Sequence, residues 1–583
     1  MSDSARVARL LGVFLVYQAV AILFYGRTLL FHFADYHAGS GPDPQFMLWS
    51  VAWWPYALSH HVNPLFSKLV WAPEGFDVVW STSINLLSIV AAPLTLRFGP
   101  VVSLNLLALT TPALTALAGF VLFRRLVGKT GPALLGGYLY GFSPFMVGHQ
   151  AGAHIVLTTA FMIPAIILLT LGRIEDRVGA TAFVVGLALL FVCQFLMGLE
   201  LLGTIGLFGA TALGVAWLIW PERRARLQSI GALIAAALAL TTIVLAPLLF
   251  HVLTGSGMGR HRVWADHGVD LFELIAPGKF FLLGDLFDRG GGGAAYDHFS
   301  RDVGGYVGLP ILLLAIVFFR ARWDERRVRF FAVMLAIIYV AALGPSLHFR
   351  GIELCAMPWK LFDKLPLINS AQAVRFTVYL HLLLALVVTL WIADTTLGVS
   401  ARWGIAALIV ASLLPNLLDR SLWAADLGTP EFFTTSAVRD NLRPGENVLL
   451  LPYSANGQGM TWQALSGMYF ASAGGWTGPT PPAFAAWPIM AMFNHGVSIP
   501  LADQQFRAFL AAHQVTAVVI DQHDPLVARW LALMDSRTTQ ITKIGGVIVA
   551  RPSAESLAPF RDATAMEMRR RMDASSQPPA RNR

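Results

Sequence analysis

The stretch FHFADYHAGSGPDPQFMLWSVAWWPYALSHH (residues 31–61) follows directly on the first long apolar run of the chain. It contains two aspartates, Asp35 and Asp43, and three tryptophans, Trp49, Trp53 and Trp54, but no Lys or Arg. An apolar run of about 20 residues can cross a bilayer as a helix. The stretch therefore predicts an acidic, aromatic loop on a membrane surface, where the tryptophans would act as interfacial anchors.

The composition agrees with a membrane protein. Of the 583 residues 56% are hydrophobic and only 13% are charged, and the mean hydropathy is +0.61. Soluble domains carry about 25% charged residues. The net charge is +8, but the basic residues gather in short blocks between apolar runs: FRRLVGK (123–129), PERRAR (221–226) and RARWDERRVR (320–329). Such blocks are typical of cytoplasmic loops, so the charge indicates topology and no nucleic-acid partner.

Eleven apolar runs are predicted to span the bilayer, at residues 7–25, 101–123, 131–147, 153–171, 180–198, 200–220, 228–250, 306–320, 328–343, 374–393 and 402–420. A further run, 84–97, is predicted to lie in the outer interface, because only then do all three basic blocks fall on the cytoplasmic side. The N-terminus is then cytoplasmic, and the loops 26–100, 251–305 and 344–373 are external. The fold class is mainly α, a polytopic helical bundle.

The C-terminal part of the chain has a different pattern. Short β-type runs, NVLLLPY (447–453), TAVVIDQ (516–522) and GGVIVARP (545–552), alternate with amphipathic stretches such as DPLVARWLALM (524–534). We therefore predict a transmembrane module over 1–420, a small external α/β domain over 421–560 and a basic, disordered tail over 561–583.

The two aspartates of the first loop are candidate catalytic bases. In DPQF (43–46) a proline follows Asp43, as at a helix start, so Asp43 is predicted to be an N-cap. A carboxylate beside an apolar surface is partly desolvated, which raises its pKa and suits it to accept a proton. The capping role can also be its whole function, and Asp35 is the alternative base.

Other polar residues stand at the external ends of predicted spans. Glu200, in MGLEL (197–201), is costly among apolar neighbours and is either functional or a packing hydrogen bond. His154 lies in a short external connection, where it contacts a polar head group or caps a helix. Arg375 lies at the mouth of a span, where a guanidinium can bind a phosphate through two hydrogen bonds or simply reach to the interface.

The second external loop carries Arg260, His261 and Arg262, which could meet an anionic group. No set of residues with metal-ligand spacing is present, and the two cysteines, Cys193 and Cys355, are predicted to be free thiols. We therefore predict no metal and no other cofactor.

Five stretches carry a family resemblance: GPDPQFMLWSVAWW (41–54), NPLFSKLVWAPEG (63–75), GFSPFMVGHQAGAH (141–154), LPLINSAQAVRF (365–376) and VLLLPY (448–453). They resemble the GT-C superfamily, integral membrane glycosyltransferases that use polyprenyl-phosphate-linked sugars, and within it the bacterial YfhO-like proteins. The resemblance implies transfer of a sugar to a lipid or polysaccharide acceptor, outside the bacterial inner (cytoplasmic) membrane.

The resemblance also implies roles for individual residues. Asp43 matches the general base that deprotonates the acceptor hydroxyl, and Arg375 matches the residue that holds the donor phosphate, with Arg260 and Arg262 as further candidates. The family often has Gly directly before its Asp-Pro pair, whereas Pro42 intervenes here, so Asp35 remains the second choice. Some members use a divalent metal and others do not.

Two other functions remain open at this stage. A transporter or flippase of lipid-linked glycans would need charged residues near the middle of several spans and an inverted repeat, and neither is clear in the sequence. A non-catalytic scaffold for envelope assembly would tolerate substitution of both Asp35 and Asp43.

Overall fold

The computed structural model describes residues 3–81, 84–254, 268–288, 304–361, 371–478, 480–534 and 538–576. The chain forms two compact units. Unit 1 comprises Met1–Ser40, Asn105–His251 and His261–Ala425, and unit 2 comprises Gly41–Leu104, Val252–Arg260 and Asp426–Arg583. The predicted domains followed the order of the chain, whereas unit 2 combines a part of the first loop with the C-terminal residues.

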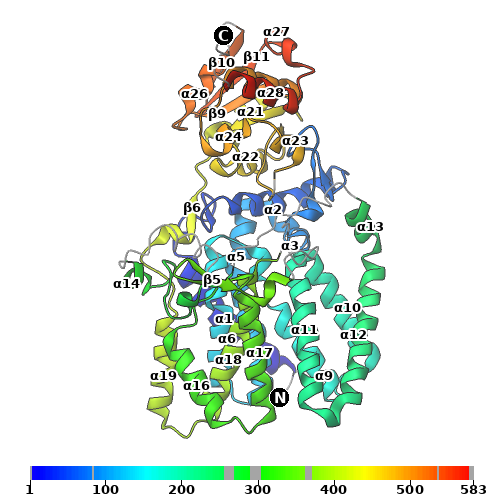
Figure 1. Cartoon of the computed structure of the whole chain (residues 1–583), viewed down its shortest axis with the longest axis vertical. Coiled ribbons are helices and arrows are strands. Elements are labelled where there is room, and N and C mark those ends of the chain that lie inside the picture. Colours follow the sequence, from blue (N-terminus) through cyan, green and yellow to red (C-terminus); the bar gives the residue numbers. More distant parts are fainter. Residues whose placement is uncertain are drawn as a thin grey trace, which may run out of the picture. The chain divides into compact units, whose positions relative to one another are not determined.

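Unit 1 is helical, and its long helices run side by side (Figure 1). Its main helices are α1 (Asp3–Tyr25), α5 (Pro100–Val127, which begins in unit 2), α6 (Thr130–Gly141), α9 (Met162–Ile174), α10 (Ala180–Met197), α11 (Leu199–Ile219), α12 (Arg224–Val244), α16 (Leu309–Ala321), α17 (Arg326–Ala342), α18 (Thr377–Asp394) and α19 (Val399–Ser412). The central helix is α18, which is largely buried and packs against α6, α16 and α17.

Seven segments of the described residues are long and apolar enough to cross a membrane: Ser4–Tyr25, Pro100–Val127, Ile155–Ile174, Ala180–Met197, Leu199–Ile219, Pro221–Val244 and Ala373–Asp394. Two shorter apolar helices are α16 and α19. The chain is a multi-pass membrane protein with a mainly helical fold, as predicted, although fewer helices than the eleven predicted spans have full spanning length.

The predicted span 131–147 is broken in the structure. It divides into α6 and α7 (Pro144–Ala151), with Phe142 and Ser143 between them. The cause is Pro144, because the residue before a proline disfavours the helical conformation, and Ser143 is extended with φ −62° and ψ 161°. The short helix α8 (Ile155–Thr158) then precedes α9. The predicted span 228–250 likewise divides, into α12 and α13 (Ala246–Thr254).

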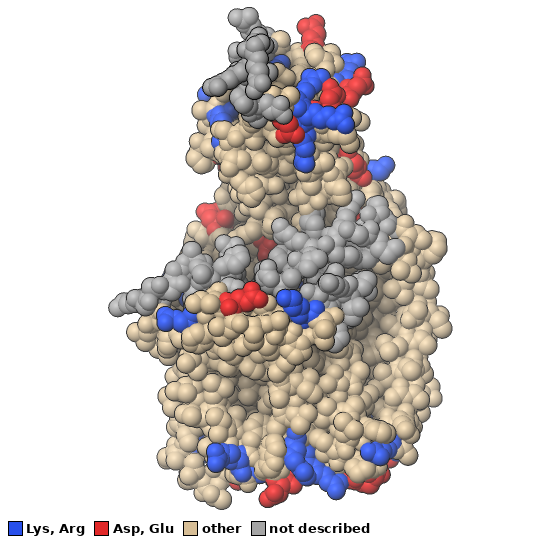
Figure 2. Space-filling view, viewed as in Figure 1, with Lys and Arg blue, Asp and Glu red and all other residues tan. Residues whose placement is uncertain are grey.

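Ion pairs join the three basic blocks at one end of unit 1. Arg125 of the first block pairs with Glu175, and Arg226 of the second pairs with the neighbouring Asp176 at 2.5 Å. Arg326 of the third block binds Glu222 of the second block at 2.7 Å. Charged side chains gather at the lower end of the view, below a broad uncharged surface (Figure 2). The blocks therefore share one end of the helical unit, as a common membrane side requires.

Short strands order the opposite ends of some helices. β1 (Tyr36–Ala38) pairs with β6 (Ala424–Asp426), and the hairpin of β4 (Ser346–Phe349) and β5 (Ile352–Ala356) follows α17. The Asn105 side chain accepts a hydrogen bond from the Ala38 amide and donates to the carbonyls of Phe33 and Tyr36. These bonds fix the backbone around Asp35.

Unit 2 contains a mixed five-stranded sheet in the order β10-β11-β9-β7-β8 (Figure 1). The strands are β7 (Asn447–Leu451), β8 (Ala471–Ser472), β9 (Ala517–Asp521), β10 (Thr539–Ile544) and β11 (Val547–Pro552). The strand β7 runs parallel to β8 and β9, whereas β11 is antiparallel to β9 and β10. The three predicted β-type runs correspond to β7, β9 and β11, so the predicted α/β pattern is confirmed.

The helices of the C-terminal part surround this sheet. They are α20 (Glu431–Thr434), α21 (Ala437–Asn441), α22 (Gly459–Leu465), α23 (Pro482–Ala485), α24 (Met490–His495), α25 (Ala502–Ala512), α26 (Val527–Ala532), α27 (Ala554–Leu557) and α28 (Ala565–Ser576). The helix α28 corrects the prediction of a disordered tail from residue 561. Its Met568 side chain is buried, and the Met568 carbonyl accepts a hydrogen bond from the Gln505 amide, so packing orders this helix.

The first-loop residues of unit 2 are built into the same fold. They form α2 (Asp43–Ser59), the strands β2 (Phe66–Ser67) and β3 (Phe76–Asp77), and the short helices α3 (Asn85–Val90) and α4 (Ala92–Phe98). The backbone amide of Ala72 donates to Ser472, and that of Ser472 donates to Leu69. The predicted run 84–97 is thus two short helices, and both pack against α2.

The three tryptophans of α2 are buried, which contradicts their predicted role as interfacial anchors. The exposed fractions of Trp49, Trp53 and Trp54 are 0%, 2% and 8%. The indole of Trp49 donates to the Gln463 side chain at 2.7 Å, and that of Trp54 donates to Asn85 at 2.9 Å. Trp49 thus joins the first-loop helix to the C-terminal residues, whereas Trp54 is bonded within the first loop. Packing against protein therefore explains these buried rings better than lipid contact.

Candidate active site

The helices of unit 1 bring Arg375 and Glu200 together. Arg375 lies in the 3-10 turn Ala373–Phe376 directly before α18, and Glu200 is the second residue of α11. One guanidinium nitrogen donates to the Glu200 carboxylate at 2.5 Å, and both side chains are largely buried, with exposed fractions of 17% and 23%. The sequence predicted both residues as site candidates but not their pairing.

The neighbouring contacts explain this geometry. Glu200, Thr204 and Phe208 are four residues apart and share one face of α11. The Thr204 hydroxyl lies 2.8 Å from the Tyr379 hydroxyl, and Phe208 packs on the rings of Phe376 and Tyr379. Because these contacts fix the start of α11 against the start of α18, the Arg375–Glu200 pair is held in place.

Two histidines lie beside this pair. The Nδ1 atoms of His149, at the end of α7, and His154, before α8, are 3.0 Å apart. Burial, together with the charges of His154 and Arg375, holds the pKa of His149 well below its usual range. His149 is therefore neutral near pH 7, and one of the two Nδ1 atoms must donate to the other. Arg375 is therefore the permanent cation of this group of side chains, and the Glu200 carboxylate balances its charge.

Asp43 lies in unit 2, as the first residue of α2. Pro42 occupies the N-cap and no side chain caps the helix, so the predicted N-cap role of Asp43 is wrong. Its carboxylate instead accepts a hydrogen bond from the indole of Trp476 at 2.8 Å. Trp476 is in turn fixed by its backbone amide, which lies 3.1 Å from the sulfur of Met460. The C-terminal residues therefore orient the predicted base.

Asp35, the alternative base, lies in unit 1 and is exposed. Its backbone amide donates to the His32 carbonyl at 3.3 Å, within the turn that leads to β1. Asn105 holds the backbone that follows Asp35, at Tyr36 and Ala38. The structure leaves Asp35 with more contact to water than Asp43, which is half-buried.

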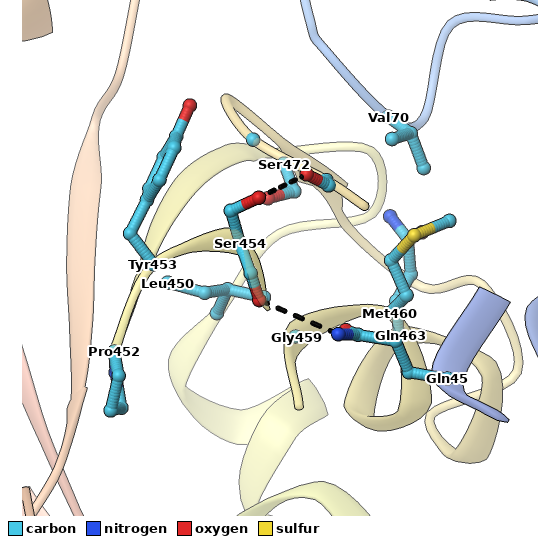
Figure 3. A pocket seen from close by; sticks show the side chains of 12 residues that line it. Gln45, Val70, Leu450, Pro452, Tyr453, Ser454, Gly459, Met460, Gln463 and Ser472 are labelled. Atoms are coloured by element: carbon cyan, nitrogen blue, oxygen red, sulfur yellow. Dashed lines mark hydrogen bonds between the residues drawn. The ribbon is translucent and has the colours of Figure 1, made fainter. Parts of the chain in front are cut away.

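Unit 2 contains a small pocket (Figure 3), and one of its lining residues is close to Asp43 in the sequence. It is lined by Gln45, Val70, Leu450, Pro452, Tyr453, Ser454, Gly459, Met460, Gln463, Ser472, Gly474 and Gly475. Gln45 comes from α2, two residues after Asp43, and Gly475 directly precedes Trp476. The first-loop residues and the C-terminal residues thus form this pocket together.

Two residues with specific side-chain hydrogen bonds, Asp270 and Trp476, were not singled out from the sequence. Asp270 is fully buried, and its carboxylate accepts the backbone amides of Phe272, Arg350 and Gly351 at 2.7–2.9 Å, which secures the turn between β4 and β5. Trp476 lies in SAGGWTGP (472–479), where glycines flank an aromatic residue. The glycines indicate a loop, which is the local signal that the sequence offers at Trp476.

The remaining predicted residues, Arg260, His261 and Arg262, lie outside the described residues. In the part of the chain that the structure does describe, no three His, Cys, Asp or Glu side chains lie together as the ligands of a metal ion would. The two cysteines of the chain, Cys193 and Cys355, are free thiols, as predicted.

Two solved structures of glycosyltransferases have a similar architecture. The archaeal oligosaccharyltransferase AglB from Archaeoglobus fulgidus, in complex with an inhibitory peptide and a dolichol-phosphate, matches 97% of this chain over 78% of its own length, with a TM-score of 0.53 and 11% identity. The arabinofuranosyltransferase AftD from Mycobacteria matches 93% of the chain, with a TM-score of 0.51 and 15% identity. The chain shares its fold with these two glycosyltransferases.

At such low identities the likeness establishes the shared fold alone. The chain spans only 40% of the length of AftD. A third match, ArnT from Cupriavidus metallidurans bound to undecaprenyl phosphate, covers 95% of this chain and 99% of ArnT, with a TM-score of 0.49 and 11% identity. No protein-family model matches the chain, and no curated protein sequence matches it. The expected GT-C architecture is confirmed, whereas the YfhO-like branch is not.

Proposed function

We propose that this protein is a glycosyltransferase that moves a sugar from a polyprenyl-phosphate donor to a lipid or polysaccharide acceptor. The reaction would take place on the external face of a bacterial cytoplasmic membrane, with the N-terminus cytoplasmic and the C-terminal residues periplasmic. The observation that carries the proposal is the GT-C fold over nearly the whole chain, since AglB, with that fold, was solved with a dolichol-phosphate. The YfhO-like motifs make that bacterial branch part of the proposal.

Each proposed role follows from the chemistry of a residue. Arg375 would bind the donor phosphate, because a guanidinium is permanently charged and its planar N–H donors match the geometry of phosphate oxygens. Charge on the phosphate grows as the sugar leaves, so a fixed cation stabilises the transition state more than the bound donor. Arg260, Arg262 and His261 would add donors from the second external loop, and His154 and Glu200 would keep Arg375 in position.

Asp43 would act as the general base. The acceptor hydroxyl loses its proton to the carboxylate while its oxygen bonds to the anomeric carbon, and the bond from that carbon to the phosphate oxygen breaks. The products are the glycosylated acceptor and the polyprenyl phosphate, with inversion at the anomeric carbon. The Trp476 indole supports this role, because a donor on one oxygen orients the other for the acceptor. Asp35 is the alternative base.

The test uses purified full-length protein in lipid nanodiscs with polyprenyl-phosphate-linked sugars, and product is measured by mass spectrometry. We expect Asp43→Asn to lower the rate by about 10²- to 10⁴-fold, the usual contribution of a general base. Asp35→Asn is the matched control and should retain most of the rate. The opposite result would assign the base to Asp35, and transfer by the double variant would remove both assignments.

The proposal contains no metal. We expect transfer to continue in EDTA at the same rate. Loss of transfer in EDTA and its recovery with Mg²⁺ or Mn²⁺ would contradict this part of the proposal.

A further inference from the structure

The pocket of unit 2 has an uncharged polar lining. None of its twelve lining residues is Asp, Glu, Lys, Arg or His. The lining instead contains two amide side chains, two serines, one tyrosine and glycine backbone. A phosphate or a carboxylate would lose its water here without a charged partner, which is unfavourable. The pocket therefore suits a neutral ligand group that both donates and accepts hydrogen bonds.

Among the lining side chains, Gln45 has an amide group that can donate a hydrogen bond to a ligand. Only 2% of the residue is exposed. Within the described residues its amide nitrogen makes one long hydrogen bond, 3.5 Å to the Ser454 carbonyl, drawn as a dashed line in Figure 3. A side-chain amide has two N–H donors, and a buried amide is normally well bonded. The Gln463 amide, by contrast, binds Leu69, Phe470 and Trp49 at 2.7–2.8 Å.

The backbone around the pocket is held in a strained form. Ser454 has φ +53°, a left-handed conformation that is costly for a residue other than glycine. Its hydroxyl donates to the Gly475 carbonyl at 2.8 Å, which links the two sides of the pocket. At Gly475 a Cβ atom would lie 2.3 Å from a methyl carbon of Val70, so any larger residue would force the lining to shift. Strain of this kind clusters at binding sites.

Asp43 and Trp476 flank the pocket in the chain. Gln45 lies two residues after Asp43 in α2, and Trp476, which is partly exposed, follows the lining residue Gly475. An indole offers an apolar face to the C–H groups of a sugar ring, while amides and serine hydroxyls bond the ring hydroxyls. The pocket has room for about one water-sized group, which matches one hydroxyl or hydroxymethyl group and not a whole ring.

We propose that this pocket is an acceptor subsite, in which Gln45 and Ser454 bind one hydroxyl or hydroxymethyl group of a neutral acceptor sugar next to Asp43. The subsite rests on the proposed transferase activity for its role, but its binding of a sugar does not require the donor. It gives the C-terminal residues a direct part in substrate recognition, because they supply Ser454, Gly475 and Trp476.

Binding is tested on the full-length protein in nanodiscs prepared without glycoside detergents, which would themselves occupy a sugar site. The probes are the methyl glycosides of glucose, galactose, mannose and N-acetylglucosamine, observed by saturation-transfer NMR. We expect saturation transfer to at least one glycoside. Gln45→Leu and the isosteric Gln45→Glu, which both remove the N–H donors, should weaken it by about fivefold or more, as loss of one hydrogen bond does.

Gln505→Leu is the matched control, because Gln505 is a fully buried glutamine of unit 2 whose amide binds the Met568 carbonyl, away from the pocket lining. It should leave saturation transfer unchanged. The subsite is overturned if no glycoside shows saturation transfer, or if a folded Gln45→Glu protein binds as the wild type does. Two variants at Gln45 keep the test decisive where one fails to fold.

Measurements on the same proteins distinguish a failure of the proposed subsite from a failure of the proposed transferase activity. Glycoside binding that depends on Gln45, with no transfer from any polyprenyl-phosphate sugar, leaves the subsite in place and removes the proposed function. Transfer by Gln45→Glu with an unchanged acceptor KM removes the subsite and leaves the proposed function in place.

Discussion

Helices α2 and α12 are both apolar, yet their surroundings differ. In α2, of unit 2, twelve of 17 residues are buried, including Trp49, Trp53 and Trp54. In α12, of unit 1, only Ile230, Ala237 and Thr241 of 21 residues are buried. An apolar side chain is stable either in a packed core or against lipid, and sequence periodicity does not separate the two. The comparison shows that apolar character marks an exposed, membrane-type surface in α12 and a packed core in α2.

The largest expected effect tests the core role of α2. Trp49→Ala removes a fully buried ring and its bond to Gln463, so we expect unfolding of unit 2 to become easier by about 3–5 kcal/mol. Ile243→Ala on α12, where the side chain is 70% exposed, should cost less than about 1 kcal/mol. Urea unfolding of the full-length protein in nanodiscs, followed by tryptophan fluorescence, measures both. Equal losses of stability would show that the two helices do not differ in how far packing stabilises them.

Arg375 provides the second test, in unit 1. We expect Arg375→Gln to raise the donor KM by about 10- to 100-fold, because a charge-assisted bond to the phosphate is lost, and Arg375→Lys to recover part of it. Arg329→Gln in α17 is the control for removal of one positive charge from the same unit. If both glutamine variants raise the KM alike, Arg375 acts only through overall charge.

Glu446 provides a pH test in unit 2. Burial alone would raise its pKa, but hydrogen bonds from Arg551, the Arg443 amide and the Thr516 hydroxyl lower the pKa of its carboxyl overall. The folded pKa is thus below the unfolded value of about 4.3. The stabilisation is complete above that value and is lost as the pH falls through the folded pKa.

We therefore expect unit 2 of the wild type to lose stability as the pH falls below about 4.5. The Glu446→Gln protein should be less stable by about 1–2 kcal/mol at pH 7, and its stability should depend less on pH. Unfolding midpoints measured between pH 3 and 7 provide the check. A wild-type curve that parallels the Glu446→Gln curve would show that other carboxyls govern the acid response.

The smallest effect is expected at the charged end of unit 1. The Arg322–Asp394 pair, at 3.0 Å, has exposed fractions of 24% and 50%. Asp394→Asn should therefore change stability by less than about 1 kcal/mol, and the change should shrink further in high salt. Thermal unfolding at two salt concentrations measures it. A loss as large as that of Glu446→Gln would show that this pair contributes more than exposed pairs normally do.

The sequence allowed the main features of the fold to be predicted. Long apolar runs and the basic blocks indicated the helical bundle and its charged end, and NVLLLPY, TAVVIDQ and GGVIVARP indicated the sheet. The break before Pro144 carried a local signal that the span assignment overlooked, since a proline restricts the residue before it. The order in the tail was not predictable in this way, because α28 depends on the distant Gln505.

The candidate site was predicted only as separate residues. Arg375 and Glu200 were each singled out, but they are 175 residues apart and no local pattern indicates that they pair. The partner of Asp43, Trp476, is 433 residues away and lies in a part of the chain that had no predicted role. Local patterns therefore identify the chemical groups, whereas packing over long separations decides which of them meet.

The bond between Trp49 and Gln463 also has a consequence for biosynthesis. The two residues are separated by 414 positions, and chains grow at roughly 5–20 residues per second. The ribosome thus completes the first-loop helix roughly 20–80 seconds before it makes the residues that bury it. During this interval Trp49 lacks its native partner. Assembly of unit 2 is therefore a late event, and a chain that ends before residue 463 would leave this aromatic surface open to aggregation or proteolysis.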